Sequence, residues 1–346
     1  MQKKVVVAVS GGVDSSVAAF LLQKKSFRVE LVFGLFVDKT EYSEIERIKN
    51  LAKRLKVSFK IIDLRKKFKN EVINYFLNTY QSGLTPNPCV ICNQKIKFKE
   101  LFKVAGRNDL FATGHYARIK KIGRNYFIFR GQDPLKDQSY FLWQIDKKIL
   151  PRLIFPLGDL TKKEVKKIAQ KEKIIGKDTS ESNDICFAPQ ISLFLKKNLP
   201  QLAEEGGVLN LKGRIIGSHQ GIIFYTIGQR GGFEIDKTKM NQPKSLPPLY
   251  VQKIKPLKNQ IVIAPRKYLY QRKIQIKNLN LFCDLPQKFQ ADVQIRYGHK
   301  SQIAKIRLKN RTAEIIFDKL IFAPTPGQSA VIYQKDKLLA GGIIKS

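Results

Sequence analysis

The segment Ser10-Gly-Gly-Val-Asp-Ser-Ser16 decides the fold of the amino-terminal part of this chain. It follows the apolar run at residues 5–9, which predicts a buried strand, and it leads into a stretch where Val13, Val17 and Leu21 recur at helical spacing. Glycines let the backbone pass close to a phosphate, and a helix amino terminus presents unpaired N–H groups and a favourable dipole. We therefore predict an anion site at this loop.

Strand-like and helix-like patterns alternate through the first third of the chain. Further apolar runs predict buried parallel strands at residues 31–37, 57–62 and 110–113. Apolar side chains recur at helical spacing at Ile45, Ile48, Ala52 and Leu55. Residues 65–80 and 162–173 predict two more helices. This order favours the α/β class, with a doubly wound parallel sheet covered by helices on both faces.

The pattern changes after about residue 202. Glycine and proline punctuate short segments from residue 206 onward, and alternating strands predominate from residue 260. These strands are predicted at residues 260–264, 273–282, 291–296, 302–308, 313–317 and 330–333. They favour a small antiparallel β-barrel or sandwich. We predict three domains, a catalytic domain at 1–204, a small central domain at 205–268 and a carboxyl-terminal β-barrel at 269–346.

The chain is strongly basic. It carries 64 Lys and Arg against 28 Asp and Glu, a formal charge of +36. Residues 251–346 alone hold 19 basic and five acidic residues, a net charge of +14. Such a field attracts polyanions, so nucleic acid is the first partner to consider. A compositional bias of the source organism explains the excess equally well, and a solvated barrel face explains the strand pattern equally well.

No segment near the amino terminus has the pattern of a signal peptide, and no apolar run has the length of a membrane span. Four cysteines in 346 residues do not form a disulfide scaffold. We therefore expect a soluble, cytoplasmic protein with no membrane partner, and we ask which cysteines are reactive.

Two cysteine segments stand out. Asn87-Pro-Cys-Val-Ile-Cys-Asn93 places two thiols three residues apart, in a loop or at a helix start, where thiolates are favoured. Cys186 lies in Ser182-Asn-Asp-Ile-Cys-Phe187. Cys283 lies in no motif, and we predict that it is an ordinary buried residue. The chain has no second Cys pair and no histidine at ligand spacing, which argues against structural zinc.

Several motifs occur in register over nearly the whole chain. The phosphate loop lacks the lysine of kinase-type loops and resembles that of the PP-loop ATP pyrophosphatase superfamily. The full series resembles the tRNA-specific 2-thiouridylase family. Its further motifs are Thr85-Pro-Asn-Pro88, Cys92-Asn-Gln-Lys-Ile-Lys-Phe98, Ala112-Thr-Gly-His-Tyr-Ala-Arg118, Lys136-Asp-Gln-Ser-Tyr-Phe-Leu142, Phe155-Pro-Leu-Gly158, Ile185-Cys-Phe187 and Tyr225-Thr-Ile-Gly-Gln-Arg230.

The resemblance implies roles for individual residues. ATP would be split between its α and β phosphates, with Asp14 helping to position Mg²⁺. The ATP-contacting positions are Ala8, Val9, Ser10, Gly11, Gly12, Val13, Asp14, Ser15, Val37 and Gly114. The tRNA-contacting positions are His115, Lys136, Asp137, Gln138, Arg296, Tyr297 and Gln328, and Asn87, Pro88 and Cys89 would line the pocket for the target base.

By the same resemblance, Cys92 is the nucleophile and Cys186 receives sulfur as a persulfide. Transfer of AMP to the uracil 2-oxygen makes it a good leaving group, which sulfur then displaces. Cys92 either attacks the persulfide to release sulfide or closes a disulfide with Cys186. Some family members carry aspartate where this chain has Cys89. The three thiols could then hold three irons of a [4Fe-4S] cluster, so both sulfur routes stay open.

The function that we predict is ATP-dependent 2-thiolation of the wobble uridine, position 34, of the tRNAs for Lys, Glu and Gln. A sulfur-donor protein or relay is expected as a second partner, and the protein is expected to bind tRNA as a monomer. Two alternatives stay open, a PP-loop ligase or amidotransferase for a small metabolite and a non-catalytic RNA-binding protein. Purely structural roles also stay open for several positions: a core histidine for His115, a charged surface turn for residues 136–138, and a solvated strand for Arg296 and Tyr297.

Overall fold

The computed structural model describes residues 2–38, 42–174, 185–236, 238 and 247–345. The chain divides into two compact units, each assembled from separate stretches of sequence. The first unit comprises Met1–Ile73, Pro88–Phe187 and Tyr333–Ala340, and the second comprises Asn74–Asn87, Ala188–Ile332 and Gly341–Ser346. The division at residues 204 and 268 stays a prediction.

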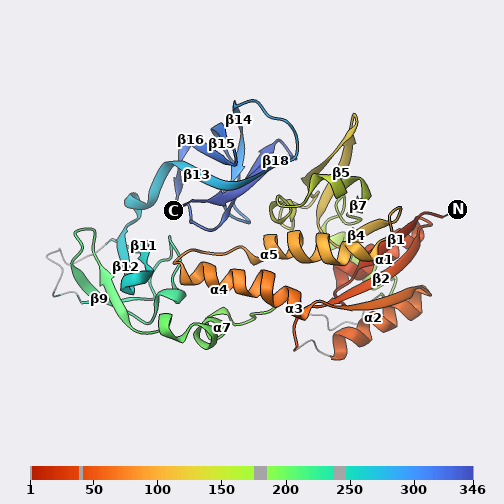
Figure 1. Ribbon diagram of the computed structural model, residues 1–346, viewed down its shortest axis with the longest axis horizontal. Helices are drawn as coiled ribbons and strands as arrows, with labels where there is room; N and C mark the ends of the chain where they lie inside the picture. Colours follow the sequence, from red (N-terminus) through yellow and green to blue (C-terminus); the bar gives the residue numbers. More distant parts are fainter. Residues whose placement is uncertain (1, 39–41, 175–184, 237, 239–246, 346) are drawn as a thin grey trace. The chain divides into compact units, whose positions relative to one another are not determined.

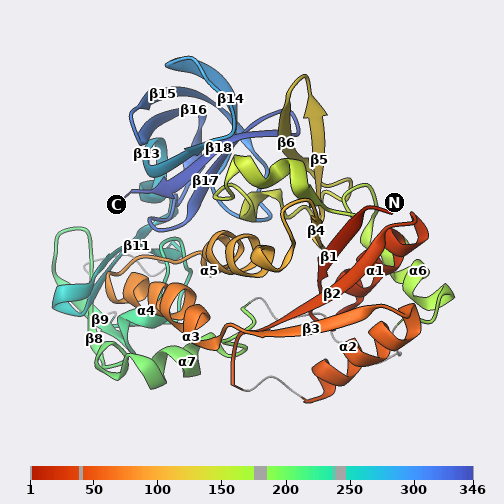
Figure 2. The same cartoon turned by 45° about the vertical axis from the view of Figure 1, so that its right-hand side comes forward.

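A parallel sheet forms the centre of the first unit. Its strands follow the order β3-β2-β1-β4-β7, and every pairing among them is parallel. Figure 2 shows β1, β2 and β3 side by side. The strands are β1 (Lys4–Ala8), β2 (Arg28–Leu35), β3 (Ser58–Asp63), β4 (Leu110–Thr113) and β7 (Leu153–Ile154). Strand β1 is central because it pairs with β2 on one side and β4 on the other.

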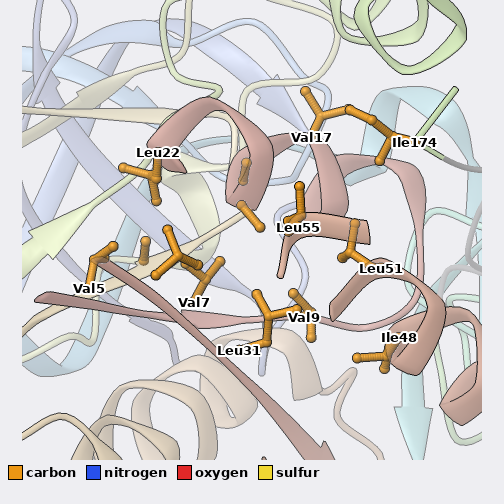
Figure 3. Close-up of a cluster of buried hydrophobic side chains, with 14 of the residues drawn as sticks. Val5, Val7, Val9, Val17, Leu22, Leu31, Ile48, Leu51, Leu55 and Ile174 are labelled. Carbon is orange, nitrogen blue, oxygen red and sulfur yellow. The ribbon is translucent and has the colours of Figure 1, made fainter. Parts of the chain in front are cut away.

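Helices cover both faces of this sheet. On one face, Val5 and Val7 of β1 pack in a buried cluster with Leu22 of α1 (Val13–Lys24), with α2 (Tyr42–Leu55) and with α6 (Lys162–Lys171) (Figure 3). On the other face, Phe111 of β4 contacts Phe98 and Phe102. Each buried valine or leucine contributes about 1.5–3 kcal/mol relative to exposure. The predicted doubly wound α/β arrangement is confirmed.

The prediction of a fully buried strand at residues 57–62 is wrong. Strand β3 lies at the edge of the sheet, and most of its side chains are exposed, including Ile61 at 44%. An edge strand has one neighbour and less helix cover, which an apolar run in the sequence does not reveal.

The remaining helices are short. The predicted helix at residues 65–80 is helical throughout but passes through a π turn, in the order α3 (Arg65–Phe68), η1 (Lys69–Ile73) and α4 (Asn74–Gln81). The motif segment forms α5 (Pro88–Ile91), the π-helix η2 (Cys92–Glu100) and η3 (Leu101–Val104). The others are η4 (Ser139–Phe141), η5 (Lys147–Arg152), α7 (Ile191–Asn198), η6 (Pro200–Leu202), η7 (Ile222–Phe224), η9 (Pro256–Lys258) and η10 (Arg266–Leu269).

A hairpin of β5 (Ala117–Ile122) and β6 (Asn125–Arg130) was not among the predicted elements. Its turn contains Gly123, whose φ of 58° suits glycine. Strand β6 also pairs with β18 (Lys337–Ile344) through Phe129 and Lys337. The hairpin follows directly on the motif that holds His115, so it helps to fix that motif in place.

The second unit contains a mixed sheet and most of a barrel (Figure 1). The mixed sheet has the order β10 (Glu234–Ile235), β9 (Ile215–His219), β8 (Gly206–Leu209), β12 (Gln260–Pro265) and β11 (Leu249–Lys255). The barrel has the order β13 (Tyr270–Leu281), β16 (Thr312–Phe322), β15 (Gln302–Lys309), β14 (Lys288–Gln294), β17 (Ser329–Gln334) and β18, and a β13–β18 pairing closes it. The predicted antiparallel barrel is confirmed.

Strand β15 shows why the barrel is basic outside. Ala304 and Ile306 are buried, whereas Lys305, Arg307 and Lys309, at the alternate positions, are exposed. The period of two along a strand places successive side chains on opposite faces. Within the described residues, no helix has both the length and the apolar character needed to cross a membrane.

Candidate active site

The phosphate loop lies at the carboxyl edge of the parallel sheet. It follows β1 directly, and Val37 and Gly114 follow the neighbouring strands β2 and β4. In parallel sheets, ligands bind outside the carboxyl ends of the strands where the chain order reverses. Strands β1 and β4 form that reversal here, because β1 leads outward through β2 to β3, and β4 lies on its other side. The fold thus brings the predicted ATP-contacting residues 8–15, Val37 and Gly114 to one edge.

The loop is shaped to admit an anion. Gly11 has a φ of 75°, a conformation that favours glycine, and Gly12 caps α1 without any side-chain hydrogen bond to the first-turn amides. The Ser15 hydroxyl accepts a hydrogen bond from the Ser10 amide at 3.1 Å and donates one to the Gly12 carbonyl at 3.2 Å. A Cβ added at Gly114 would lie 2.9 Å from the Ser15 amide nitrogen, so β4 approaches the loop as closely as backbones can. These residues fit a phosphate group.

Asp14, in the first turn of α1, has two partners from distant segments. The Lys162 Nζ lies 2.6 and 2.8 Å from its two carboxylate oxygens, and the Tyr116 hydroxyl donates a hydrogen bond to Oδ1 at 2.8 Å. Lys162 begins α6, where Thr161 and Glu164 form a capping box. Sequence reasoning missed Lys162, since a single lysine on an amphipathic helix gives no signal of a site.

The motif cysteines gather beside this edge. Cys92 starts the π-helix η2, is 8% exposed and packs in a cluster with Phe68 and Ile96, against which the partly buried Val37 and Phe187 also pack. Cys186, adjacent to Phe187, is exposed, and all four cysteines are free thiols. The Cys89 and Cys186 thiols both act electrostatically on Cys92, so the three sulfurs lie near one another. Ser182, Asn183 and Asp184 of the second cysteine motif lie outside the described residues.

The phosphate loop and Cys186 share a neighbour. A Cβ on Gly11 would lie 3.2 Å from the carbonyl oxygen of Glu44, near the start of α2. The Glu44 carboxylate in turn acts electrostatically on Cys186 and raises the pKa of that thiol. Glu44 thus contacts the loop and lies within electrostatic range of the Cys186 thiol, which indicates that the anion site and this thiol belong to the same region of the first unit.

Burial and charge oppose each other at the thiols. Burial raises the pKa of Cys92 to about 12. Loss of solvent around the sulfur raises the pKa of Cys186 as well. The Lys97 ammonium lowers the pKa of both thiols. Lys97 follows Cys92 by five residues, which in an α-helix would turn it about 140° away. The i→i+5 register of a π-helix instead brings it back towards the Cys92 face, and sequence reasoning missed this residue as well.

The thiols do not fit a cluster site as they are arranged. In the part of the chain that the structure describes, no three His, Cys, Asp or Glu side chains are placed to hold a metal ion. Cys92 is buried in an apolar cluster, whereas Cys186 is exposed, so the thiols differ in burial although they lie in the same region. The donor geometry needed for three irons of a [4Fe-4S] cluster is therefore missing from this arrangement.

The predicted tRNA-contacting residues of the first unit are largely enclosed. His115 is buried between Phe98 and Phe155, its Nδ1 lies 2.6 Å from the Thr113 hydroxyl, and burial holds its pKa well below 6.5. Asp137 is 8% exposed, and its carboxylate accepts hydrogen bonds from the Gly131 and Ser139 amides and from the Ser139 hydroxyl and Arg130. Their contact with tRNA stays a prediction.

Gln138 instead contacts the backbone of Tyr116. Its side-chain oxygen accepts a hydrogen bond from the backbone amide of Tyr116 at 3.1 Å. The backbone amide of Gln138 donates a hydrogen bond to the Tyr116 carbonyl at 2.9 Å. Because the Tyr116 hydroxyl reaches Asp14, the turn at residues 136–138 helps to position the acidic residue of the loop. Lys136 is half-buried in the same turn.

The remaining predicted tRNA-contacting residues lie in the second unit, except that Pro88 and Cys89 belong to the first. Arg296 donates to the Thr325 hydroxyl at 2.7 Å, and Tyr297 is 40% exposed. The Gln328 side chain donates to the carbonyls of Thr85 at 3.3 Å and Pro86 at 2.8 Å. It therefore holds the segment that leads into Asn87, which is itself buried.

Comparison with known proteins gives a consistent assignment. Residues 3–190 match a family described as tRNA methyl transferase HUP domain, residues 192–265 its PRC-barrel domain, and residues 271–344 an aminomethyltransferase beta-barrel domain. The chain is 37% identical over 350 residues to the tRNA-specific 2-thiouridylase MnmA of Nitratiruptor sp., covering 99% of this chain and 100% of that protein. It is 38% identical to the protein of the same name from Syntrophomonas wolfei, covering 99% of each chain.

Proposed function

Since the chain belongs to the tRNA-specific 2-thiouridylase family, we propose that it transfers sulfur to carbon 2 of the wobble uridine of tRNA at the expense of ATP. One observation carries this proposal: at the sheet edge that holds the anion-binding loop, Glu44 contacts the loop and acts electrostatically on Cys186, and Val37 packs against the cluster that contains Cys92. Activation of a base by adenylation and its attack by sulfur need both groups in one place. The names of the two relatives support the 2-thiolation of uridine in tRNA.

The first step uses the phosphate loop. The uracil 2-oxygen attacks the α-phosphorus of ATP, the bond between the α-phosphorus and the bridging oxygen breaks, and pyrophosphate leaves with the electron pair. Glycine backbone amides and the Ser10 and Ser15 hydroxyls are the groups that fit around the departing phosphates. Asp14 is the residue that would hold Mg²⁺, whose charge offsets that of the phosphates.

The second step uses the thiols. A persulfide on the exposed Cys186, formed by a donor protein that carries sulfane sulfur, attacks carbon 2, and AMP leaves with its oxygen. The Cys92 thiolate then attacks the Sγ of Cys186, forming the Cys92–Cys186 disulfide and leaving sulfur on the base. A dithiol reductant supplies two electrons to restore both thiols. We favour this persulfide route because the three cysteines are not arranged as cluster ligands.

The pKa of Cys92 and the charge of Lys97 suit a sequence in which Cys92 reacts after Cys186. At neutral pH the Cys92 thiol, with a pKa of about 12, keeps its proton and cannot attack prematurely. The Lys97 ammonium stabilises negative charge at both sulfurs when it develops. The Cys89 thiol acts electrostatically on Cys92. The family resemblance implies an aspartate at this position in some members, and a thiol cannot replace its carboxylate as a base, so we propose that Cys89 lines the base pocket together with Asn87 and Pro88.

We further propose that the substrates are the tRNAs for Lys, Glu and Gln and that the protein acts in the cytoplasm as a monomer on tRNA. The exposed basic face of β15 and the overall charge of +36 favour a polyanionic partner. The anticodon loop is single-stranded, so extruding its wobble base costs little.

The test is nucleoside mass spectrometry of tRNA incubated with the protein, Mg²⁺, ATP, a persulfide donor and reductant. The expected product is 2-thiouridine at position 34. Cys92→Ser and Cys186→Ser should lower product formation below about one part in a thousand while leaving tRNA-dependent pyrophosphate release intact, since adenylation precedes sulfur transfer. Cys283→Ser is the matched control and should retain wild-type product formation, because Cys283 belongs to neither of the motifs that hold the other three cysteines.

The same spectra distinguish the competing activities. A methylated uridine would support the methyl transferase in the family descriptions, and 4-thiouridine or 2-thiocytidine would indicate a different thiolation. Tight tRNA binding without any ATP-dependent product would support a non-catalytic RNA-binding protein. Wild-type 2-thiouridine formation by Cys186→Ser would overturn the persulfide role.

A further inference from the structure

The proposed chemistry assigns no role to the turn η10 (Arg266–Leu269), which joins β12 of the mixed sheet to β13 of the barrel (Figure 1). Leu269 is 2% exposed and anchors the turn in a buried apolar cluster. The three residues that precede it, Arg266, Lys267 and Tyr268, are all exposed. A fixed turn therefore presents two cations and an aromatic ring to solvent.

Both cations of the turn lie over aromatic rings. The Lys267 Nζ is 5.3 Å from the centre of the Tyr268 ring. The Arg266 guanidinium is 5.0 Å from the centre of the Phe322 ring and 5.8 Å from that of Tyr270. Within the described residues, neither cation pairs with a carboxylate. Contact with a ring leaves the edge N–H groups of an arginine and the protons of an ammonium available to an anion.

The two tyrosines of this region differ in their surroundings. Tyr270 pairs with Phe322 across β13 and β16, and the centres of their rings are 5.4 Å apart. Tyr268 is 50% exposed, and in the described part of the chain no other aromatic ring contacts it. A single ammonium covers only one face of a ring, so the exposed surface of Tyr268 offers an area on which a planar base stacks.

Hydrogen bonds connect the turn to Arg296, one of the predicted tRNA-contacting residues. The Ala323 amide donates to the Leu269 carbonyl at 2.9 Å, and the Thr325 hydroxyl donates to the Ala323 carbonyl at 3.0 Å. Arg296 donates to the same Thr325 hydroxyl at 2.7 Å. All four residues belong to the second unit. The turn and Arg296 therefore lie at the same end of the barrel, where β16 ends.

The strands next to the turn add positive charge. Residues 266–273 and 312–322 lie side by side because β13 pairs with β16, and they carry five basic and two acidic side chains, a net charge of +3. One of the acidic side chains, Glu314, is neutralised by Lys273 at 2.6 Å. The surface around the turn therefore attracts a ligand that carries phosphates.

We propose that η10 binds an unpaired nucleotide of the substrate tRNA other than the target base, with the base stacked on Tyr268 and the flanking phosphates held by Arg266 and Lys267. The inference rests on tRNA being the substrate, as proposed above. Bases within a stem are stacked on both faces, so only an unpaired base presents a face to the ring. A ring beside cations that lack carboxylate partners is the arrangement that binds single-stranded nucleic acid.

The test measures tRNA affinity of the full-length protein by fluorescence anisotropy, with a labelled transcript of the tRNA for Glu and no ATP. Tyr268→Ala should weaken binding by about 5- to 100-fold, the range for loss of one base–aromatic stack, and Tyr268→Phe should stay within about twofold of wild type. Lys267→Met should lower the slope of log Kd against log salt by about 0.7, because one phosphate contact is lost. A loss below about fivefold in Tyr268→Ala would overturn the proposal.

Tyr126→Ala is the matched control, because Tyr126 is a partly exposed tyrosine whose ring also has a lysine over it, with the Lys121 Nζ at 6.0 Å from the ring centre. Its tRNA affinity should stay within about twofold of wild type. An equal loss in both variants would show that surface tyrosines act without a specific site, which overturns the proposal. Unchanged tRNA affinity in Tyr268→Ala with slower persulfide formation on Cys186 would assign the surface to the sulfur-donor protein and would also overturn it.

A second measurement needs no variant and covers a Tyr268→Ala protein that fails to fold. The complex of wild-type protein and tRNA is irradiated with ultraviolet light, which joins aromatic side chains to bases in direct contact, and mass spectrometry identifies the linked peptide and nucleotide. The expected adduct joins Tyr268 to a base in a loop or at an unpaired end of the tRNA. An adduct of Tyr268 to a base within a stem, or no adduct at Tyr268, would contradict the proposal.

These results are separable from those on the proposed function. If Tyr268→Ala weakens tRNA binding but the wild-type protein forms no 2-thiouridine, only the thiolation is contradicted. If 2-thiouridine forms and Tyr268→Ala binds tRNA as the wild type does, only the role of η10 is contradicted.

Discussion

The phosphate loop and the turn at residues 136–138 were both predicted to contact ligands, but the structure treats their polar groups differently. In the loop, the first-turn amides of α1 have no side-chain cap, and the Asp14 side chain is 34% exposed while it pairs with Lys162. In the turn, Asp137 accepts four hydrogen bonds from its own surroundings and is buried. Polar motif residues therefore occur both in sites that are open to a ligand and in networks that are closed to one. The two kinds differ in how many of their hydrogen-bonding groups are already paired within the protein.

Asp137→Asn tests whether the buried hydrogen-bond network of the turn stabilises the fold. The change removes a charge that faces Arg130, whose guanidinium also stacks on the buried Tyr333 at 3.7 Å, so the free energy of unfolding should fall by about 2–4 kcal/mol. Urea denaturation measures the loss. Asp336→Asn is the control, because the Asp336 side chain that pairs with Arg118 is 59% exposed, and exposed carboxylates contribute about 0–1 kcal/mol through such pairs. Equal, small losses would show that the network contributes little stability.

The same contrast between open and closed groups applies to the thiols. Cys186 is exposed and Cys92 is buried with a pKa of about 12, so iodoacetamide at pH 8 should alkylate Cys186 first. The raised pKa alone should slow Cys92 by roughly 50-fold relative to a free thiol, after allowance for its greater nucleophilicity. Peptide mass spectrometry over time gives both rates. Alkylation of Cys92 at or above the rate of Cys186 would contradict the burial seen here.

Lys97→Met sharpens this experiment. Removing the ammonium should slow alkylation of both Cys92 and Cys186, since its charge lowers the pKa of both thiols. Lys99→Met is a matched control, as Lys99 is exposed on the same helix. If both variants slow the reaction equally, the effect comes from net charge rather than from the position of Lys97.

Gly114→Ala tests whether the phosphate loop needs its close backbone packing to bind ATP. The new Cβ would lie 2.9 Å from the Ser15 amide nitrogen and 3.0 Å from the Asp14 carbonyl carbon, so the loop must shift. Overpacking of this kind costs about 1–3 kcal/mol, which predicts ATP binding weaker by roughly 10- to 100-fold. Calorimetry with ATP and Mg²⁺ measures it. Gly207→Ala, where the nearest atoms are at 3.7 Å, should bind ATP as wild type does.

The smallest effect is expected from pH. Burial holds the pKa of His115 well below 6.5, so the native state keeps it neutral while the unfolded chain takes up a proton as pH falls through 6.5. The stability associated with neutral His115 is thus present above pH 6.5 and is lost below it, by at most about 1.4 kcal/mol per pH unit. His115→Phe should lose less unfolding free energy than wild type between pH 7 and pH 5.5. Identical pH slopes would contradict the burial of this residue.

Predictions from the sequence succeeded where local pattern and fold agree. The apolar run before Ser10, the glycines and the helical spacing after them imply β1, the loop and α1, and the structure has all three. The alternating strands of the barrel were found for the same reason, although β13 and β14 begin three residues earlier than predicted. Strand β7 was missed because it has two residues and its partner β4 is distant in sequence. The β5–β6 hairpin was missed although its strands pair locally, because the mostly exposed β5 has no buried apolar run.

Predictions of the site were less complete. The motifs located the phosphate loop and the cysteines, but Lys97 and Lys162 carry no sequence signal of their own. Lys97 approaches Cys92 because η2 has a π register, and Lys162 approaches Asp14 because α6 packs on α1. A spacing in sequence becomes a distance only after the helix type and the helix packing are known.

The sequence by itself determined the chemistry available to this protein: an anion loop with glycines where the backbone must turn, three motif cysteines, and a strongly basic chain. Tertiary structure alone decided which of these groups are exposed, which are satisfied internally, and which distant side chains join them. The physical reason is that residue type fixes what a group can donate, accept or carry, whereas burial and neighbours fix its pKa, its partners and its access to a ligand.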